Sequence, residues 1–200
     1  MSIKINYSNK VINKSSANLV LFVDEKFSLS NLKKYLSNSE FSYINDLIKT
    51  SDVKKNMFVF EVNSKKKIVL ISIKKDLKNF DVENLGAEFY GRVNYGKNSE
   101  YFINSDSIIS KHENFTGYFL HGIKLKSYEF NKYKTKKETR LISITVLGNK
   151  NKPSTKSQLK FKALEEGIFY ARDLVSEPGN ILHPDEYAKR LNSLKKNGLK

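Results

Sequence analysis

The sequence has 200 residues, enough for one complete domain and part of another, and 36 Lys and Arg against 21 Asp and Glu give a formal net charge of +15. It contains no Cys, which excludes disulfides, thiolate metal sites and a cysteine nucleophile. It shows neither a signal peptide nor a run of the ~20 apolar residues that cross a bilayer, so we expect a soluble, cytoplasmic protein without a membrane partner.

The first half of the chain predicts strands that alternate with helices. Runs of β-branched, aromatic and aliphatic residues indicate strands at 18–23, 57–62 and 67–73, and the last is continuously apolar, as in a strand covered on both faces. Apolar residues recur at helical spacing over 29–48, and again from Val82 to Phe89. These segments predict an α/β fold in which helices pack on both faces of a mixed sheet.

The second half predicts one more strand and two helices. The strand covers 141–147 and is followed by the polar, Pro-containing stretch 149–155, which we interpret as a boundary between a first domain (1–150) and a second region (151–200). One helix should then run to about Ser176, and the other should begin at Pro184 and end at Gly198. The face of the first helix that we expect to pack inward carries Phe161, Leu164, Ile168, Ala171 and Val175.

One segment is close to a phosphate-binding loop. Residues 91–98 read Gly-Arg-Val-Asn-Tyr-Gly-Lys-Asn, but Asn98 stands where Ser or Thr would ligate Mg²⁺. Such a loop has to leave a strand directly, whereas the residues before it predict a helix. We therefore expect a helix followed by a turn, without nucleotide binding.

The residues that usually carry catalysis are sparse. His112, His121 and His183 form no metal-binding helical pair, and each is expected to be an ordinary surface or turn residue. The acidic residues form no cluster that would hold two metals. We therefore identify no catalytic, metal-binding or cofactor-binding residue in the chain.

Two motifs, in matching order and spacing, resemble the leucyl (cytosol) aminopeptidase family. Residues 122–134 are similar to the family segment Gly-x-x-Leu-x-x-Tyr-x-Phe-x-x-Tyr-Lys. Residues 171–184 are similar to its signature Ala-Arg-Asp-Leu-x-Asn-x-Pro-x-Asn-x-x-x-Pro, except that Ser176 replaces the usual Asn. The resemblance implies a macro-like amino-terminal domain followed by the opening helices of a metallopeptidase catalytic domain.

The resemblance also implies a function for a longer parent protein. Family members form homohexamers and remove amino-terminal residues from peptides with water held between two divalent metals, Mn or Zn. Their metal-binding and catalytic segments do not occur in this sequence, so we expect the chain to be a truncated, inactive part with a scaffold or oligomerisation role. We assign the second motif to that scaffold, with Arg172 and Asp173 ordering the turn that follows them. Its structural residues are Arg172, Asp173, Pro178, Asn180 and Pro184.

An alternative from a different class is a basic nucleic-acid-binding module. Clustered cations bind the phosphate backbone, and interleaved aromatic residues can stack on bases. The basic residues are almost all Lys, however, and Arg is the residue preferred for bidentate phosphate and base contacts, so a solvated lysine surface is favoured. The candidate DNA contacts are Lys134, Lys136 and Lys137, within a basic run that begins at Lys132. Further lysines lie at 65–67 and 74–75, and aromatic residues at Tyr128, Phe130 and Tyr133.

Overall fold

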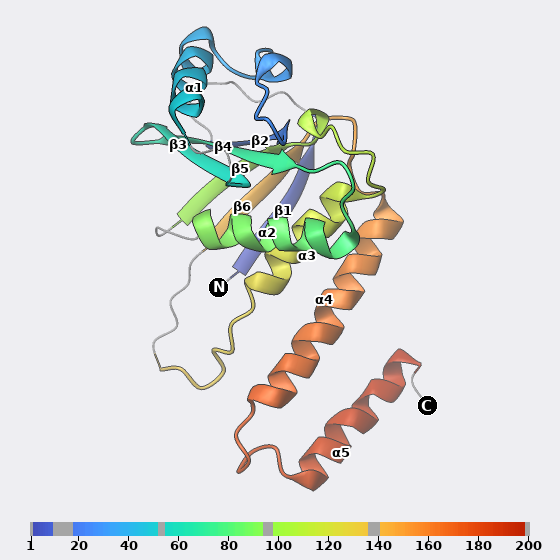
Figure 1. The fold of residues 1–200 in the computed structure, drawn as a ribbon. Coiled ribbons are helices and arrows are strands. Elements are labelled where there is room, and N and C mark those ends of the chain that lie inside the picture. Colours follow the sequence, from blue (N-terminus) through green and yellow to red (C-terminus); the bar gives the residue numbers. More distant parts are fainter. Residues whose placement is uncertain (1, 10–17, 52–54, 94–97, 136–140, 199–200) are drawn as a thin grey trace.

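The computed structural model describes residues 2–9, 18–51, 55–93, 98–135 and 141–198. A six-stranded sheet is covered by helices on both faces, and a pair of helices extends away from it (Figure 1). The strands are β1 (Ser2–Ser8), β2 (Asn18–Asp24), β3 (Met57–Asn63), β4 (Lys66–Ile73), β5 (Asn98–Asn104) and β6 (Leu141–Leu147). The α-helices are α1 (Asn38–Thr50), α2 (Asn79–Val93), α3 (Phe115–Lys126), α4 (Thr155–Ser176) and α5 (Pro184–Asn192).

The sheet is mixed, with the order β1-β6-β5-β2-β4-β3. All neighbouring strands are parallel except β3, which pairs antiparallel with β4. Strand β4 is buried along almost its whole length, because α1 covers one face of the sheet while α2 and α3 cover the other. The α/β fold class and the doubly covered strand are therefore confirmed.

The core has one layer on each face of the sheet. In the larger layer, the ring of Phe22 on β2 makes edge-to-face contacts with Phe115 and Phe119 on α3. Helices α2 and α3 approach closely here, because a Cβ at Gly86 would lie 2.0 Å from the Phe119 carbonyl oxygen. The smaller layer packs the opposite face of β2 against α1 and the segment before it.

The helical pattern over 29–48 is only partly realised. Helix α1 begins at Asn38 with a capping box between Ser37 and Glu40, but residues 29–36 form a three-residue 3₁₀ helix, η1 (Ser30–Leu32), and turns. The Asp24 carboxylate accepts hydrogen bonds from the amides of Lys26 and Ser28. These side-chain bonds favour a turn just before residue 29. Residues 29–36 continue as a 3₁₀ helix and turns, so the prediction of a helix over 29–36 was wrong.

The first helix after the sheet ends and the second begins where predicted, but the second is shorter than predicted, because α5 ends at Asn192. Helix α4 ends at Ser176, α5 begins at Pro184, and the following 3₁₀ helix, η3 (Ser193–Asn197), ends at Gly198, whose φ is 83°. The expectation that one face of α4 packs inward was wrong beyond its start: Phe161 is buried, but Leu164 is 43% exposed and Val175 is 87% exposed.

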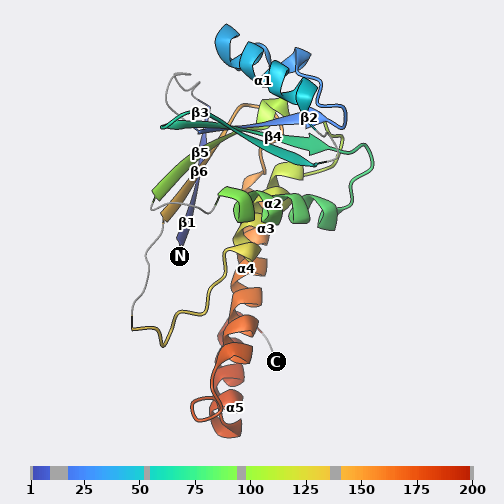
Figure 2. The same ribbon diagram turned by 60° about the vertical axis from the view of Figure 1, so that its left-hand side comes forward.

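The reason is that α4 leaves the sheet and passes beyond the core (Figure 2). Within the described ranges, α4 is long enough to span a bilayer, but neither it nor another helix is sufficiently apolar to do so.

Candidate functional site

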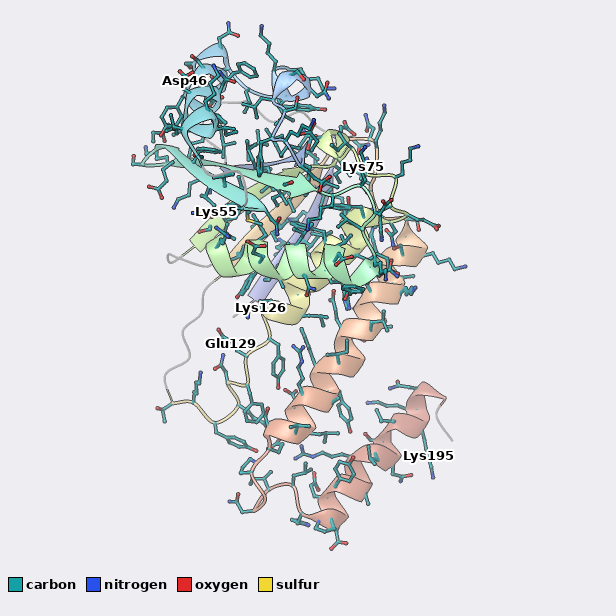
Figure 3. All side chains as sticks on the ribbon, in the orientation of Figure 1. Asp46, Lys55, Lys75, Lys126, Glu129 and Lys195 are labelled. Carbon is teal, nitrogen blue, oxygen red and sulfur yellow. The ribbon has the colours of Figure 1, made fainter. Side chains whose placement is uncertain are left out.

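The structure brings the two motifs together. The segment that leaves α3 passes beside α4; Figure 3 labels Lys126, the last residue of α3, and Glu129 on that segment. The Arg172 Nη1 atom donates to the Leu125 carbonyl oxygen at 2.6 Å, and the Tyr128 hydroxyl donates to Asp173 Oδ1 at 2.7 Å. The Arg172 guanidinium also lies 5.4 Å from the centre of the Tyr128 ring. These side chains therefore hold the preceding motif, rather than ordering the following turn as the sequence suggested.

The main feature of this contact is Glu177, the residue directly after α4. Its side chain is only 1% exposed, and its carboxylate accepts hydrogen bonds from Lys132 Nζ, the Tyr133 hydroxyl and Arg190 Nη1, the last at 3.0 Å. We call Lys132, Tyr133, Glu177 and Arg190 the junction cluster. It joins the first motif, the end of α4 and helix α5 at one carboxylate.

The electrostatics of the junction cluster favour an ionised carboxylate. Hydrogen bonds from Lys132 and then Tyr133, with a further one from Arg190, lower the pKa of Glu177 from 4.5 to about 2. The same hydrogen bonds to Glu177 raise the pKa values of Lys132 and Tyr133. Glu177 is therefore charged at neutral pH and suited to structural binding, not to the proton transfer of a general acid or base.

Arg190 connects α5 to the other residues of the junction cluster and to α4. Its Nε atom donates to Glu186 Oε1 at 3.0 Å, and its backbone carbonyl accepts from the Tyr170 hydroxyl on α4 at 2.9 Å. The pKa of Arg190 is raised by its hydrogen bonds to Glu186 and Glu177. Helix α5 is thus held through both the side chain and the backbone of one residue. Of the four residues of the junction cluster, the sequence analysis named Lys132 and Tyr133 only as possible nucleic-acid contacts, and it did not identify Glu177 or Arg190 as site residues.

The remaining residues of the predicted scaffold lie in the turn between α4 and α5. The Pro178 carbonyl accepts hydrogen bonds from the amides of Ile181 and Leu182, both at 2.9 Å, and Pro184 is at the first position of α5. Asn180 is exposed, and within the described residues its side chain makes no hydrogen bond. The turn is shaped by backbone bonds and prolines.

The three histidines have different surroundings. His183 caps α5 and His112 lies in the turn before α3, as expected. The expectation for His121 was wrong, because it is 4% exposed within α3, with Nδ1 3.6 Å from Glu165 Oε1 and Nε2 4.0 Å from Glu83 Oε1. Burial arises because α2 and α4 both pack on α3 around it.

The segment that resembles a phosphate-binding loop begins inside a helix. Helix α2 continues through Gly91 and Arg92 to Val93, so the prediction that a helix precedes the loop is confirmed. Residues 94–97 lie outside the described ranges.

The lysines proposed for DNA contact are only partly available. Lys66 is 3% exposed and forms an ion pair with Glu40 at 2.6 Å, so its assignment to a basic surface was wrong. Lys67 pairs with Glu61 at 2.7 Å. Lys134 is exposed, whereas Lys136 and Lys137 lie outside the described residues.

The structure does not provide the ligands of a metal centre in the part of the chain that it describes. There, no group of three or more His, Asp or Glu side chains is placed to hold a metal ion. The two metals implied by the family resemblance therefore do not fit these residues, and we derive no chemistry through them.

Comparison with known proteins gives sequence matches over part of the chain. No protein-family model matches the sequence. A probable cytosol aminopeptidase from Xanthobacter autotrophicus is 38% identical over 73 residues, which cover 34% of this chain and 15% of the relative. One from Nitrobacter winogradskyi is 26% identical over 140 residues, covering 66% of this chain and 28% of the relative. The matched part of the chain therefore corresponds to well under a third of each of these relatives.

Solved structures match over nearly the whole chain. A mutant of tomato leucine aminopeptidase has a TM-score of 0.70 at 16% identity, covering 98% of this chain and 42% of that one. Cytosol aminopeptidase from Coxiella burnetii has a TM-score of 0.62 at 14% identity, covering 96% and 37%. At such low identity these neighbours show the fold. Sequence and fold together confirm that the chain resembles the amino-terminal region of the leucyl, or cytosol, aminopeptidases.

Proposed function

We propose that this chain is the amino-terminal part of a metal-dependent aminopeptidase and acts in it as a scaffold. The observation that carries the scaffold role is the buried carboxylate of Glu177, which binds Lys132 and Tyr133 of the first motif together with Arg190 of α5. The similarity to cytosol aminopeptidases supports the peptidase activity of the parent protein. The chain itself would not cleave peptides.

The junction cluster would fix the direction in which α4 and α5 leave the sheet. Residues 1–150 would form the first domain, and residues 151–200 would lead into the metallopeptidase domain. That domain would supply the peptide-binding site and the ligands for two divalent metals, Mn or Zn. A cytoplasmic location agrees with the names of the relatives, and a homohexamer is the assembly that we propose.

The activity is tested by comparing residues 1–200 with the protein encoded by the natural gene together with its downstream sequence. Release of p-nitroaniline from leucine p-nitroanilide is measured with added Mn²⁺ or Zn²⁺. We expect metal-dependent release from the longer protein and none from residues 1–200. Release by the shorter chain, or a longer protein that stays inactive with both metals, contradicts the proposal.

The nucleic-acid alternative is less favoured by the described residues. Lys66, Lys67 and Lys132 are occupied by ion pairs with Glu40, Glu61 and Glu177 respectively. The exposed lysine surface should then bind duplex DNA no more tightly than the ~10⁻⁴–10⁻⁶ M of non-specific binding at physiological salt. Replacing Lys134, Lys136 and Lys137 by Glu should abolish any tighter binding, if it is found.

A further inference from the structure

The carboxyl ends of β2 and β5 meet at a topological switch point. These strands are parallel neighbours in the sheet. The chain that follows β2 passes to α1 on one face, whereas the chain that follows β5 passes to α3 on the opposite face (Figure 2). In open α/β sheets the crevice outside such strand ends is the preferred place for a ligand.

A pocket of about 710 Å³ occupies this position. One wall comes from the residues after β2 and the other from the residues after β5. Ser107 joins the walls, because its Oγ atom accepts a hydrogen bond from the Phe22 amide of β2 at 3.0 Å. The residues that line the pocket are Ser30, Asn31, Leu32, Lys33, Lys34, Tyr35, Asn38, Asp106, Ser107 and Ile109.

The segments that lead into the two walls are ordered by hydrogen bonds between side chains and the backbone. Ahead of the first wall, Asp24 Oδ1 accepts the amides of Lys26 and Ser28 at 3.1 Å and 2.9 Å, and the intervening Phe27 is buried with a φ of 53°. Ahead of the second wall, the single proton of the Ser105 hydroxyl is shared between the Leu147 and Lys150 carbonyl oxygens, which lie 2.8 Å and 2.6 Å from Oγ. The chain therefore enters both walls from ordered segments, and order that exists before a ligand arrives reduces the entropic cost of binding.

The charges in the pocket favour an anion. Lys33 and Lys34 lie on the first wall, and Lys34 Nζ is 4.8 Å from the centre of the Tyr35 ring. Among the described lining residues Asp106 supplies the one carboxylate, and its Oδ1 atom already accepts the amides of Asn149 and Lys150 at 2.9 Å and 2.7 Å. Two cations and several hydroxyl and amide donors thus face one carboxylate that is partly neutralised. This combination suits a phosphate group, whose oxygens accept charge-assisted hydrogen bonds.

We propose that this pocket binds a small molecule that carries a phosphate group, and that Lys33 and Lys34 hold the phosphate. The proposal is independent of the aminopeptidase assignment, because it uses none of the residues of the junction cluster.

The test is an NMR titration of the 200-residue chain with inorganic phosphate and with glucose 6-phosphate, using glucose as the uncharged control. We expect saturable amide shifts in both walls, residues 30–38 and 106–109, with either phosphate compound and none with glucose. The proposal is overturned if the shifts are confined to other lysine-rich surfaces. It is also overturned if saturable shifts at millimolar concentrations of the phosphate compounds are not seen in both walls.

A pair of variants of equal charge separates a specific site from a generally basic surface. Replacing Lys33 and Lys34 by Gln should raise the dissociation constant for glucose 6-phosphate at least about tenfold, equivalent to about 1.4 kcal/mol. The control replaces Lys156 and Lys160 on the exposed side of α4 by Gln, and should leave the constant unchanged. If both pairs of substitutions raise the dissociation constant equally, glucose 6-phosphate binds to basic surface in general rather than to this pocket, and the proposal fails. All four lysines are exposed, so neither variant should unfold the chain.

Discussion

The Tyr133 hydroxyl donates a hydrogen bond to the carboxylate of Glu177, 44 residues further along the chain. This bond joins the two sequence motifs that resemble the aminopeptidases. Lys132 and Arg190 bind the same carboxylate from two other directions. The junction cluster therefore links the two segments that carry the motifs, although Lys132 and Glu177 stand at unspecified positions of those motifs, and it leads to the predictions below.

Removal of the carboxylate charge should destabilise the chain. In Glu177→Gln, Lys132 and Arg190, whose side chains are 52% and 22% exposed, lose the charge of their common, buried partner. We expect the melting temperature to fall by at least about 2–4 °C, measured by circular dichroism. The control is Glu166→Gln, because Glu166 is exposed on α4 and lies 3.9 Å from Lys162. Equal melting temperatures for the two variants would show that the junction cluster contributes no stability.

The contribution of Glu177 should depend on pH in the acid range. Its pKa is about 2 in the folded chain against an ordinary value of 4.5. A lowered folded-state pKa adds stability above the ordinary value, and that stability is lost as the pH falls through the folded-state value. The stability difference between the wild type and Glu177→Gln should therefore be constant above about pH 4.5 and shrink towards pH 2. Urea midpoints measured across this range check the trend, and a difference that grows on acidification contradicts it.

The attachment of α4 to the core should rest on Phe161. This buried ring contacts His121 at 5.0 Å and Tyr118 at 5.0 Å between ring centres. Phe161→Ala should cost about 3–5 kcal/mol in the free energy of unfolding, as large core truncations do. Val175→Ala, on the exposed part of the same helix, should change it by less than about 0.5 kcal/mol. Similar losses of unfolding free energy in both variants would mean that the face of α4 from Phe161 to Val175 is packed along its whole length in solution.

The side chain of Asn180 should be nearly neutral for stability. The sequence analysis assigned Asn180 to the structural scaffold, whereas the structure places its side chain in solvent and closes the turn through the Pro178 carbonyl. Asn180→Ala should therefore change the free energy of unfolding by less than about 0.5 kcal/mol. A loss of about 1 kcal/mol, the usual value of a helix cap, would restore the earlier assignment.

Limited proteolysis should cut the chain within or next to residues 149–155. The amides of Asn149 and Lys150 are held by Asp106, so the cut should fall after them, near Ser154. Mass spectrometry of the early fragments identifies the site. A resistant fragment that continues through Pro153 into α4 would count against the division into residues 1–150 and 151–200.

The sequence predicted β2, β3, β4 and β6, because these strands are apolar runs rich in β-branched or aromatic residues, but it did not predict β1 or β5, whose residues are more polar. The 141–147 strand coincides with β6. It did not reveal which helical face is covered: the periodicity of α4 is the same at Phe161 and Val175, but the core ends between them. It also could not identify the junction cluster. Glu177 looks like an ordinary residue at a helix end, and only the fold brings Lys132, Tyr133 and Arg190 to it.

The scaffold role is tested most directly by placing Glu177→Gln in the proposed parent protein and measuring both melting temperature and turnover of leucine p-nitroanilide. Glu166→Gln again serves as the control. We expect the melting temperature to fall in Glu177→Gln alone, while kcat and KM, measured well below the melting transition, stay close to those of the wild type. An unchanged melting temperature with kcat reduced about a hundredfold, equivalent to about 2.7 kcal/mol of barrier, would contradict this role and place Glu177 in catalysis.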